Sequence, residues 1–302
     1  MTAALNTFSD NTEKTAAITK YAKKVGVRVT SPKFGVSRSN YAFDRDRAII
    51  AKGMSAVKHI GKKLAQEIHG LSDDGKTYDR FSDLLADLYG RTSIDSQQLS
   101  TLIHIDFFSD FGNQRELESI VYFWEFFKRG AAKQIKKDKV AGSYIDEIVQ
   151  RHSTDRKKDG GISTSYTLTD VPAIIRECED KVLSLGLKDY GVITKARYFN
   201  ECMGYNGFVS GREEDRSTLF IRDVFPAKRK KDGKQFGYNV LTQSLGSGIE
   251  SRFTVFSTTY KEDPIKKGDV IKCLKFRRDG KGYFTLEKYR HVTIDDDVME
   301  GV

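Results

Sequence analysis

The stretch AKGMSAVKHIGKKLAQEI, residues Ala51 to Ile68, decides how the N-terminal half of the chain folds. Apolar residues recur at helical spacing on each side of a glycine: Ala56, Val57 and Ile60 before Gly61, and Leu64, Ala65 and Ile68 after it. A glycine at this point breaks the pattern where a turn must fit. The stretch predicts two short helices joined by a tight hairpin, with the second helix beginning at Lys62.

The start of that second helix is a candidate phosphate site. The backbone N–H groups of a first helical turn have no partner within the helix, and Lys62 and Lys63 lie beside them. Free amides and lysine side chains suit a phosphate of a DNA or RNA backbone and carry no base readout. We assign five DNA-contacting residues here: Lys58, His59, Gly61, Lys62 and Lys63. Taken alone, the stretch is equally consistent with an amphipathic hairpin packed in a core.

The pattern resembles the helix-hairpin-helix motif of DNA repair and replication proteins, which has apolar, Gly, apolar, Gly, three residues and Ala. Ile60, Gly61 and Ala65 match it. His59 stands in place of the first Gly, on which the close approach to a phosphate and any bound monovalent cation depend.

Composition favours a polyanionic partner. The chain has 302 residues, enough for about two domains, with a net charge of +9. Residues 212–290 contain 19 Lys or Arg and 11 Asp or Glu, a difference of +8, so the last third holds most of the charge.

The three cysteines form no CxxC pair and signal neither disulfides nor a metal site. Without a signal peptide or membrane span, the protein is expected in the cytoplasm, with no membrane partner and no cofactor of its own.

From about Cys202 the hydrophobic period changes to two. Six segments are candidate strands: Gly204–Gly211, Thr218–Lys228, Phe236–Gln243, Ser251–Ser257, Asp269–Arg277 and Tyr283–His291. Two Asp-Gly pairs, at Asp232 and Asp279, predict hairpin turns, and Thr259–Pro264 predicts a turn or short helix. This order of parts predicts an OB-fold barrel.

Such a barrel commonly binds single strands, because basic side chains follow the backbone and exposed aromatic rings stack on bases. The candidate rings are Phe225, Phe236, Tyr238, Phe253, Tyr283 and Phe284. The candidate basic residues are Lys228, Arg229, Lys230, Lys231, Lys234, Arg277, Arg278 and Lys281. Strand alternation sends about half of the rings into the core, so we expect two or three on the surface. A structural barrel that binds nothing specific is the alternative.

The sequence as a whole predicts an α+β multidomain protein: a mainly helical N-terminal part with a helix-hairpin-helix, followed by an all-β OB-fold barrel. The expected segments are a fingers-like remnant (1–46), the helix-hairpin-helix domain (47–150), a linker and connecting helix (151–201), the OB domain (202–293) and an acidic tail (294–302). Within them, Lys128–Lys139 is expected as the solvated basic tail of a long helix, and Arg151–Gly161 as a linker or loop.

The order of these parts resembles the C-terminal portion of the alpha subunit of bacterial replicative DNA polymerase III. ITKYAKKVGVRVTSPKFGVSRSNYAF is similar to the end of that family's fingers region at Gly26, Val27, Val29, Pro32 and Ser37. AKGMSAVKHIG is similar to its Gly-Leu-x-Ala-Ile-Lys-Gly-Val-Gly at Gly53, Met54, Ala56, Val57, Lys58, Ile60 and Gly61. LSTLIHIDFFSDFGNQREL is similar to its Leu-Ile-x-Ala-Gly-Ala-Phe-Asp-x-x-Gly-x-x-Arg at Leu102, Ile103, Phe108, Gly112 and Arg115, with Asp106 and Phe107 where the family has small residues.

The resemblance implies a part of a DNA-directed DNA polymerase, a nucleotidyltransferase, that acts in DNA replication. The family's palm aspartates and their Mg²⁺ ions have no counterpart here, so we expect no catalytic residue in this chain and Mg²⁺ only in a partner that carries the palm. We interpret the chain as a separately encoded piece, from a phage or a split gene, that grips duplex and single-stranded DNA. A sliding clamp is a further implied partner, although Gln98-Leu99-Ser100 is too faint a match to assign a clamp site. The alternatives are an autonomous DNA-binding accessory protein of replication or repair, and a protein-interaction scaffold.

Overall fold

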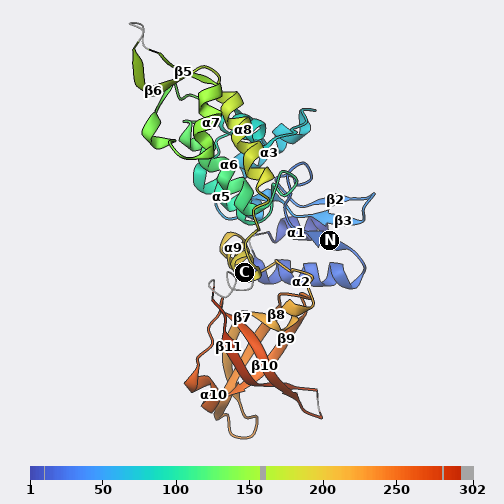
Figure 1. Cartoon of the computed structure of the whole chain (residues 1–302). Helices are drawn as coiled ribbons and strands as arrows, with labels where there is room; N and C mark the ends of the chain where they lie inside the picture. The colour runs from blue at the N-terminus through green and yellow to red at the C-terminus, as the bar shows by residue number, and fades with distance from the viewer. Residues whose placement is uncertain (10, 157–160, 281, 294–302) are drawn as a thin grey trace. The chain divides into compact units, whose positions relative to one another are not determined.

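The computed structural model describes residues 1–9, 11–156, 161–280 and 282–293. The chain forms two compact units, Met1–Asp189 and Tyr190–Val302 (Figure 1). The finer division expected from composition, with boundaries at residues 46, 150, 201 and 293, remains a prediction; its acidic tail lies outside the described residues. No helix in the described part of the chain is long and apolar enough to cross a membrane.

The first unit is mainly helical. Its α-helices are α1 (Thr2–Thr7), α2 (Thr12–Lys24), α3 (Lys62–Asp73), α4 (Phe81–Arg91), α5 (Ser96–His104), α6 (Gln114–Phe126), α7 (Tyr144–Arg151) and α8 (Val171–Ser184). Capping boxes begin α5 at Asp95 and α6 at Asn113, where each side chain accepts from the backbone three residues on. The apolar faces of α4, α5 and α6 are buried as their spacing predicts.

The N-terminal segment packs into this helical unit. Strands β1 (Arg28–Thr30), β2 (Ala42–Asp44) and β3 (Ile49–Ala51) form a small sheet in the order β1-β3-β2. The loop after β1 brings Phe34 against the buried rings of Phe107 and Phe108, at centroid distances of 6.1 and 5.9 Å. The backbone N–H of Phe34 also donates to the carbonyl of Phe107 at 2.9 Å. The N-terminal segment therefore packs against the residues that follow α5.

The basic stretch Lys128–Lys139 is not the tail of a long helix, as expected, because α6 ends at Phe126. Lys128 and Arg129 adopt φ values of 50° and 56°, in the left-handed region, and their N–H groups donate to Glu125 and Trp124. This reversal leads into β4 (Gln134–Lys136) and the 3₁₀ turn η2 (Lys137–Lys139).

The stretch Arg151–Gly161 is likewise not simply a linker. Its described part contains the end of α7 and strand β5 (Ser153–Arg156), and β6 (Ile162–Leu168) follows. The three strands form a sheet in the order β4-β6-β5, antiparallel throughout. Its pairing of Ile135 with Tyr166 joins segments about thirty residues apart, which no local pattern reports.

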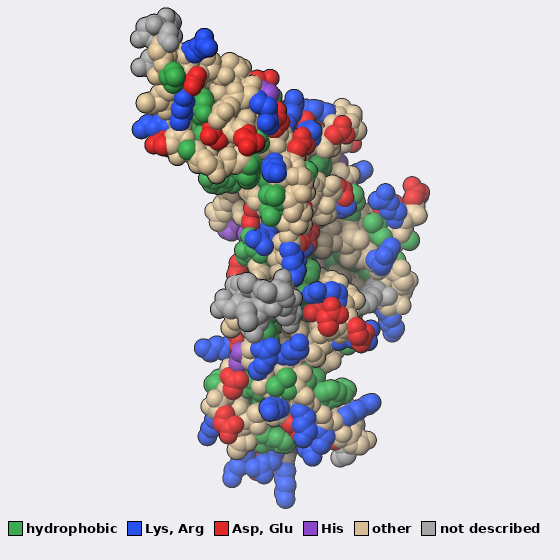
Figure 2. Space-filling view, viewed as in Figure 1, with side chains coloured by type: hydrophobic (Ala, Val, Ile, Leu, Met, Phe, Trp, Pro, Cys, Tyr) green, Lys and Arg blue, Asp and Glu red, His purple; other side chains and the backbone are tan. Residues whose placement is uncertain are grey.

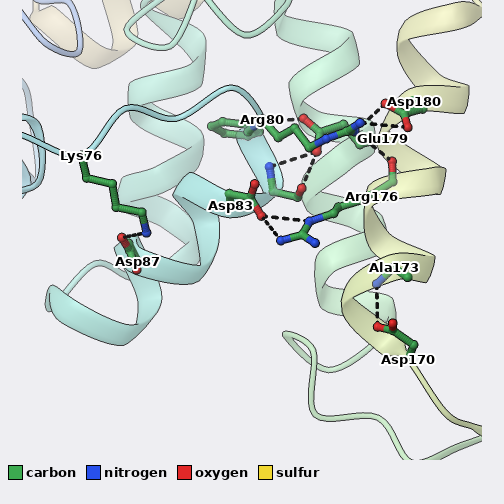
Figure 3. Close-up of polar contacts among 11 residues, drawn as sticks. Lys76, Arg80, Asp83, Asp87, Asp170, Ala173, Arg176, Glu179 and Asp180 are labelled. Atoms are coloured by element: carbon green, nitrogen blue, oxygen red, sulfur yellow. Dashed lines mark hydrogen bonds and ion pairs between the residues drawn. The ribbon is translucent and has the colours of Figure 1, made fainter.

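Helix α4 is fixed by a buried carboxylate from α8. No side chain caps α4 from its N-cap residue, Arg80. Instead Glu179, which is 1% exposed, accepts from the backbone N–H groups of Phe81 and Ser82 at 2.7 and 3.2 Å, and from the Ser82 hydroxyl. Figure 3 shows this contact between two exposed ion pairs, Arg80 with Asp180 and Arg176 with Asp83.

The second unit is a closed five-stranded barrel preceded by a helix. Helix α9 (Val192–Met203) and the 3₁₀ turn η3 (Glu214–Ser217) precede the strands β7 (Thr218–Lys228), β8 (Gln235–Ser244), β9 (Glu250–Phe256), β10 (Val270–Arg278) and β11 (Phe284–His291). The strand order is β7-β8-β9-β11-β10, and β10 pairs back to β7. Strands β9 and β11 are parallel, and the short helix α10 (Ser257–Glu262) lies between β9 and β10 in sequence. This is an OB-like barrel.

One of the six expected strands is wrong. The segment Gly204–Gly211 forms no strand: Gly204 ends α9 with a φ of 77°, and the Asn206 side chain binds the backbone of Phe208. A side chain that satisfies neighbouring backbone groups replaces the hydrogen bonds of a sheet. The other five strands and the short helix form within a few residues of their expected bounds.

Candidate nucleic-acid interface

The hairpin has one helix fewer than the sequence predicts. Met54–Ala56 forms only a single 3₁₀ turn, η1, and the chain becomes extended at Val57. Gly53, the N-cap residue of this turn, is packed closely against the backbone of Ser39 and Asn40. The second helix, α3, begins at Lys62 as expected, with Gly61 as its N-cap residue.

His59 adopts the backbone conformation for which the motif uses glycine. Its φ is 65°, in the left-handed region that a side chain disfavours by about 1 kcal/mol. The Gln98 side chain donates to the His59 carbonyl at 3.1 Å, and the next residue, Ile60, is buried. These contacts stabilise the turn, so His59 adopts the left-handed backbone geometry that the motif's glycine would adopt. Asp106 stands where the polymerase pattern around Leu102 has its first glycine, and it too has a left-handed φ, of 60°.

Neither backbone conformation nor packing requires a glycine at position 61. Its φ of −69° and ψ of 161° are open to any residue, and a Cβ there would meet nothing within 4 Å. The first turn of α3 has neither a side-chain cap nor an acidic residue. A Ser, Thr, Asp or Asn is usual at this position and stabilises a helix by about 1 kcal/mol. The bare N-terminus therefore leaves room and unshared amides for a group from outside.

The five hairpin candidates lie within six consecutive residues, 58–63. Lys58, His59, Gly61, Lys62 and Lys63 are all exposed. Lys63 lies 3.8 Å from Glu67 one turn along α3, a weak pair that solvent screens. The residues behind them, Val57, Leu64, Ala65 and Ile68, are buried, which confirms the apolar pattern on which the hairpin was predicted.

A family model described as a helix-hairpin-helix motif matches residues 26–117. The match contains η1, the His59 turn and α3 to α5, so it supports a helix-hairpin-helix region of the DNA-binding class here. No curated protein matches the chain.

The barrel separates the predicted aromatic residues into two groups. Phe253 is 7% exposed within the core, so its ring is not open to a base and its assignment as a stacking residue is corrected. Phe284 is partly buried and packs against that core. Tyr283 is 68% exposed, and Phe225, Phe236 and Tyr238 are half-buried. Tyr238 stacks on Tyr260 at a centroid distance of 3.7 Å, which already occupies one face of its ring.

The strand register reveals a row across the outside of the barrel. Phe225 pairs with Asn239, Asn239 with Thr254, Thr254 with Thr285, and Thr285 with Arg277. Paired residues share a face, and Val240 and Phe253, the neighbours of Asn239 and Thr254, point into the core. The row therefore brings together two predicted residues, Phe225 and Arg277, that lie far apart in the sequence.

Arg252 also belongs to this surface, although the candidate residues predicted from the sequence do not include it. Its guanidinium lies 5.2 Å from the Phe225 ring centroid and donates to the Asn239 Oδ1 at 3.1 Å. A guanidinium beside an aromatic ring suits a phosphate next to a stacked base. Strand alternation from Phe253 would have placed Arg252 outside, had the inward direction of Phe253 been known.

The remaining basic candidates lie at the strand ends. Lys228, Arg229, Lys230, Lys231 and Lys234 are exposed around the β7–β8 turn, and Arg278 is exposed at the end of β10. Lys281 lies outside the described residues. Figure 2 shows Lys and Arg side chains gathered over the visible face of the barrel. Within the described ranges, no three His, Cys, Asp or Glu side chains come close enough to hold a metal ion.

A buried lysine lies directly before the hairpin. Lys52 is 6% exposed, and burial lowers its pKa from 10.5 to about 8. Between these two pH values the unfolded chain binds more protons than the folded one, so the free energy of unfolding rises with pH, by up to about 3 kcal/mol. Below pH 8 both states are protonated, and the folded state bears the full cost of burying the charge.

We expect Lys52→Met to remove this rise between pH 8 and 9.5, as measured by urea unfolding at a series of pH values. Burial raises the pKa of Tyr41 to about 12, so its contribution changes only above pH 10. Burial also raises the pKa of the Cys178 thiol, from 9.0 to about 12, which lowers the free energy of unfolding as pH rises through 9. This thiol is present in both proteins, so the difference between the slopes of the wild type and Lys52→Met reports the lysine alone. Exposed Lys24→Met is the matched control and should keep the wild-type slope. Equal slopes for the wild type and Lys52→Met would contradict the prediction.

Proposed function

We propose that this chain is the DNA-binding C-terminal part of a replicative DNA polymerase III alpha-like subunit. In this proposal the hairpin binds duplex backbone phosphates and the barrel binds the single-stranded template. The observation that carries it is the N-terminus of α3: a glycine that the fold does not require, no cap, and lysines on each side of the turn. The free backbone amides of this arrangement can donate hydrogen bonds to a phosphate, as the amides at helix N-termini do in many nucleotide and phosphate sites.

The barrel supports the second half of the proposal. Its outer surface combines the half-buried Phe225 ring with the guanidinium groups of Arg252 and Arg277. Thr254 and Thr285 lie in the same row, while Asn239 is only 7% exposed and holds the Arg252 guanidinium in place. The surrounding turns are basic, in agreement with the charge of the last third of the sequence. This combination suits a single strand, whose bases stack on aromatic rings while cationic groups neutralise its phosphates.

The polymerase part of the proposal rests on the order of motifs. Several residues that carry the resemblance also have clear structural roles: Pro32 is buried, the Ser37 hydroxyl accepts from the Lys33 N–H at 3.0 Å, and Gly53 allows a close backbone contact. Co-purification with a chain that carries palm aspartates tests this part separately from DNA binding.

DNA binding is tested by fluorescence anisotropy of the full chain with duplex and single-stranded DNA across a salt series. We expect Gly61→Ala to unfold at the wild-type temperature but bind duplex about tenfold more weakly, because the new methyl group occupies the approach to the amides.

Lys62→Ala with Lys63→Ala should lower the salt slope by about two, or one for each lost phosphate contact.

Gly70→Ala, farther along α3, is the control for Gly61→Ala. A Cβ at position 70 also meets nothing within 4 Å, but it lies away from the amides at the start of the helix, so we expect this variant to keep duplex affinity. For the barrel, Phe225→Ala with Arg252→Ala should weaken single-strand binding only, while exposed Tyr21→Ala on α2 leaves it unchanged. Unaltered duplex affinity and salt slope in the Gly61 and lysine variants would show that the hairpin is not a DNA site.

A further inference from the structure

The first unit contains a cavity of about 790 Å³ beside the hairpin helix. Its walls come from α1 (Thr2 and Asn6), from the segment 36–44, from Ala51 and from α3 (Gln66 and His69). Pockets of a few hundred cubic ångströms or more accommodate ligands of nucleotide size. None of the DNA-contacting residues assigned above lines it.

The cavity wall is preformed and carries an unshared cation. The Asn6 side chain both donates to the Tyr41 carbonyl at 3.0 Å and accepts from the Tyr41 N–H at 2.8 Å, which fixes α1 against the wall. Arg38 is exposed, and no carboxylate in the described ranges lies within ion-pair distance of it. The one acidic lining residue, Asp44, accepts from the N–H groups of Asp46 and Arg47 and so is already engaged.

Two further features of the wall indicate a ligand with an aromatic part and polar edges. The Phe43 ring is 48% exposed, unusual for a phenylalanine that lines a cavity. Ser39 is 8% exposed, and its buried hydroxyl finds no hydrogen-bond partner in the part of the chain that the structure describes. Asn40 and Gln66, both exposed, add amide groups that can both donate and accept.

One face of α3 joins this cavity to the hairpin. Lys62, Gln66 and His69 are spaced by four and three residues, so they lie on the same side of the helix. At about 1.5 Å per residue, His69 lies roughly 10 Å along the axis from Lys62. A strand with one phosphate at the start of α3 can therefore reach the cavity within a few nucleotides.

We propose that the cavity receives an unpaired nucleotide of the DNA strand held by the hairpin. The Phe43 ring stacks on its base, the Arg38 guanidinium binds its phosphate, and the amides of Asn40 and Gln66 contact its base edge. This inference rests on the proposed function, because the hairpin supplies the strand.

The test uses the full chain with a duplex that has a single-stranded overhang and with a blunt duplex of equal paired length. The fluorescent base 2-aminopurine is placed at each overhang position in turn, so that stacking in the cavity quenches one position. We expect Phe43→Ala to remove the quenching at that position, and Phe43→Tyr to keep it. Arg38→Ala should reduce affinity for the overhang duplex about tenfold without affecting the blunt duplex, whereas exposed Arg28→Ala affects neither.

The outcomes separate this inference from the proposed function. If Lys62→Ala with Lys63→Ala weakens both duplexes while the Phe43 and Arg38 variants change neither quenching nor overhang affinity, the cavity is not a nucleotide site and the hairpin remains one. If the lysine variants have no effect but Phe43→Ala still removes the quenching, the cavity binds the overhang but the hairpin does not supply its strand, which overturns both the hairpin assignment and that part of this inference. If free dAMP binds as tightly as the overhang duplex does, and Arg38→Ala abolishes that binding, the ligand of the cavity is a free nucleotide and not part of a DNA strand.

Discussion

Replacing Glu179 with alanine should lower the free energy of unfolding by several kcal/mol, about 2 to 6 for two unsatisfied backbone donors. The carboxylate is 1% exposed and accepts from two backbone N–H groups and a hydroxyl at the start of α4. Alanine leaves the Phe81 and Ser82 donors buried without an acceptor, and each unsatisfied buried group costs about 1–3 kcal/mol. It also removes the negative charge that interacts favourably with the positive end of the α4 dipole.

Urea unfolding with matched variants checks this prediction. Glu179→Gln keeps the shape and one carbonyl oxygen, so we expect a smaller loss than for alanine. Asp180→Ala removes the neighbouring exposed pair with Arg80 and should cost at most about 1 kcal/mol. The assignment of Glu179 as the cap of α4 would be wrong if its alanine variant were no less stable than Asp180→Ala.

Gly53→Ala should destabilise the first unit by about 3 kcal/mol or more. A Cβ at this position would lie 2.5 Å from the carbonyl carbon of Asn40 and 2.6 Å from the carbonyl oxygen of Ser39. Both are backbone atoms, so no side-chain rotation relieves the overlap. The φ of −70° and ψ of 144° suit alanine, so the cost is steric and not conformational.

The segments around Gly53 are also tied by hydrogen bonds that alanine would strain. The N–H of Met54 donates to the Arg38 carbonyl at 2.9 Å, and the N–H and hydroxyl of Ser55 donate to the Ser39 carbonyl at 3.1 and 2.6 Å. Thermal unfolding of Gly53→Ala beside Gly61→Ala is the measurement, since the same methyl group enters a packed site in one variant and open space in the other. Equal unfolding temperatures for the two variants would contradict this account of the glycines.

Local sequence patterns are enough to predict several elements of this fold. The amphipathic faces of α3 to α6 appear as 3.6-residue periods, and the five barrel strands appear as period-two segments between turn residues. The position of α3 follows from the apolar pattern around Gly61, and the excess of basic residues in the last third is a count. Neighbouring residues supply all of this information, so no distant contact is needed to obtain it.

Other features depend on contacts between residues that are far apart in the sequence, and local patterns do not predict them. The sheet β4-β6-β5 needs the register between residues 134–136 and 165–167, and the α4 cap comes from Glu179, almost a hundred residues away. Whether an aromatic ring of the barrel faces the core or the solvent depends on strand register, because a shift of one residue turns every side chain of the strand to the other face. In β9 the register turns Phe253 into the core and Arg252 toward the candidate surface. The left-handed turn at His59 persists because Gln98 from α5 holds its carbonyl, a contact that the local sequence does not contain.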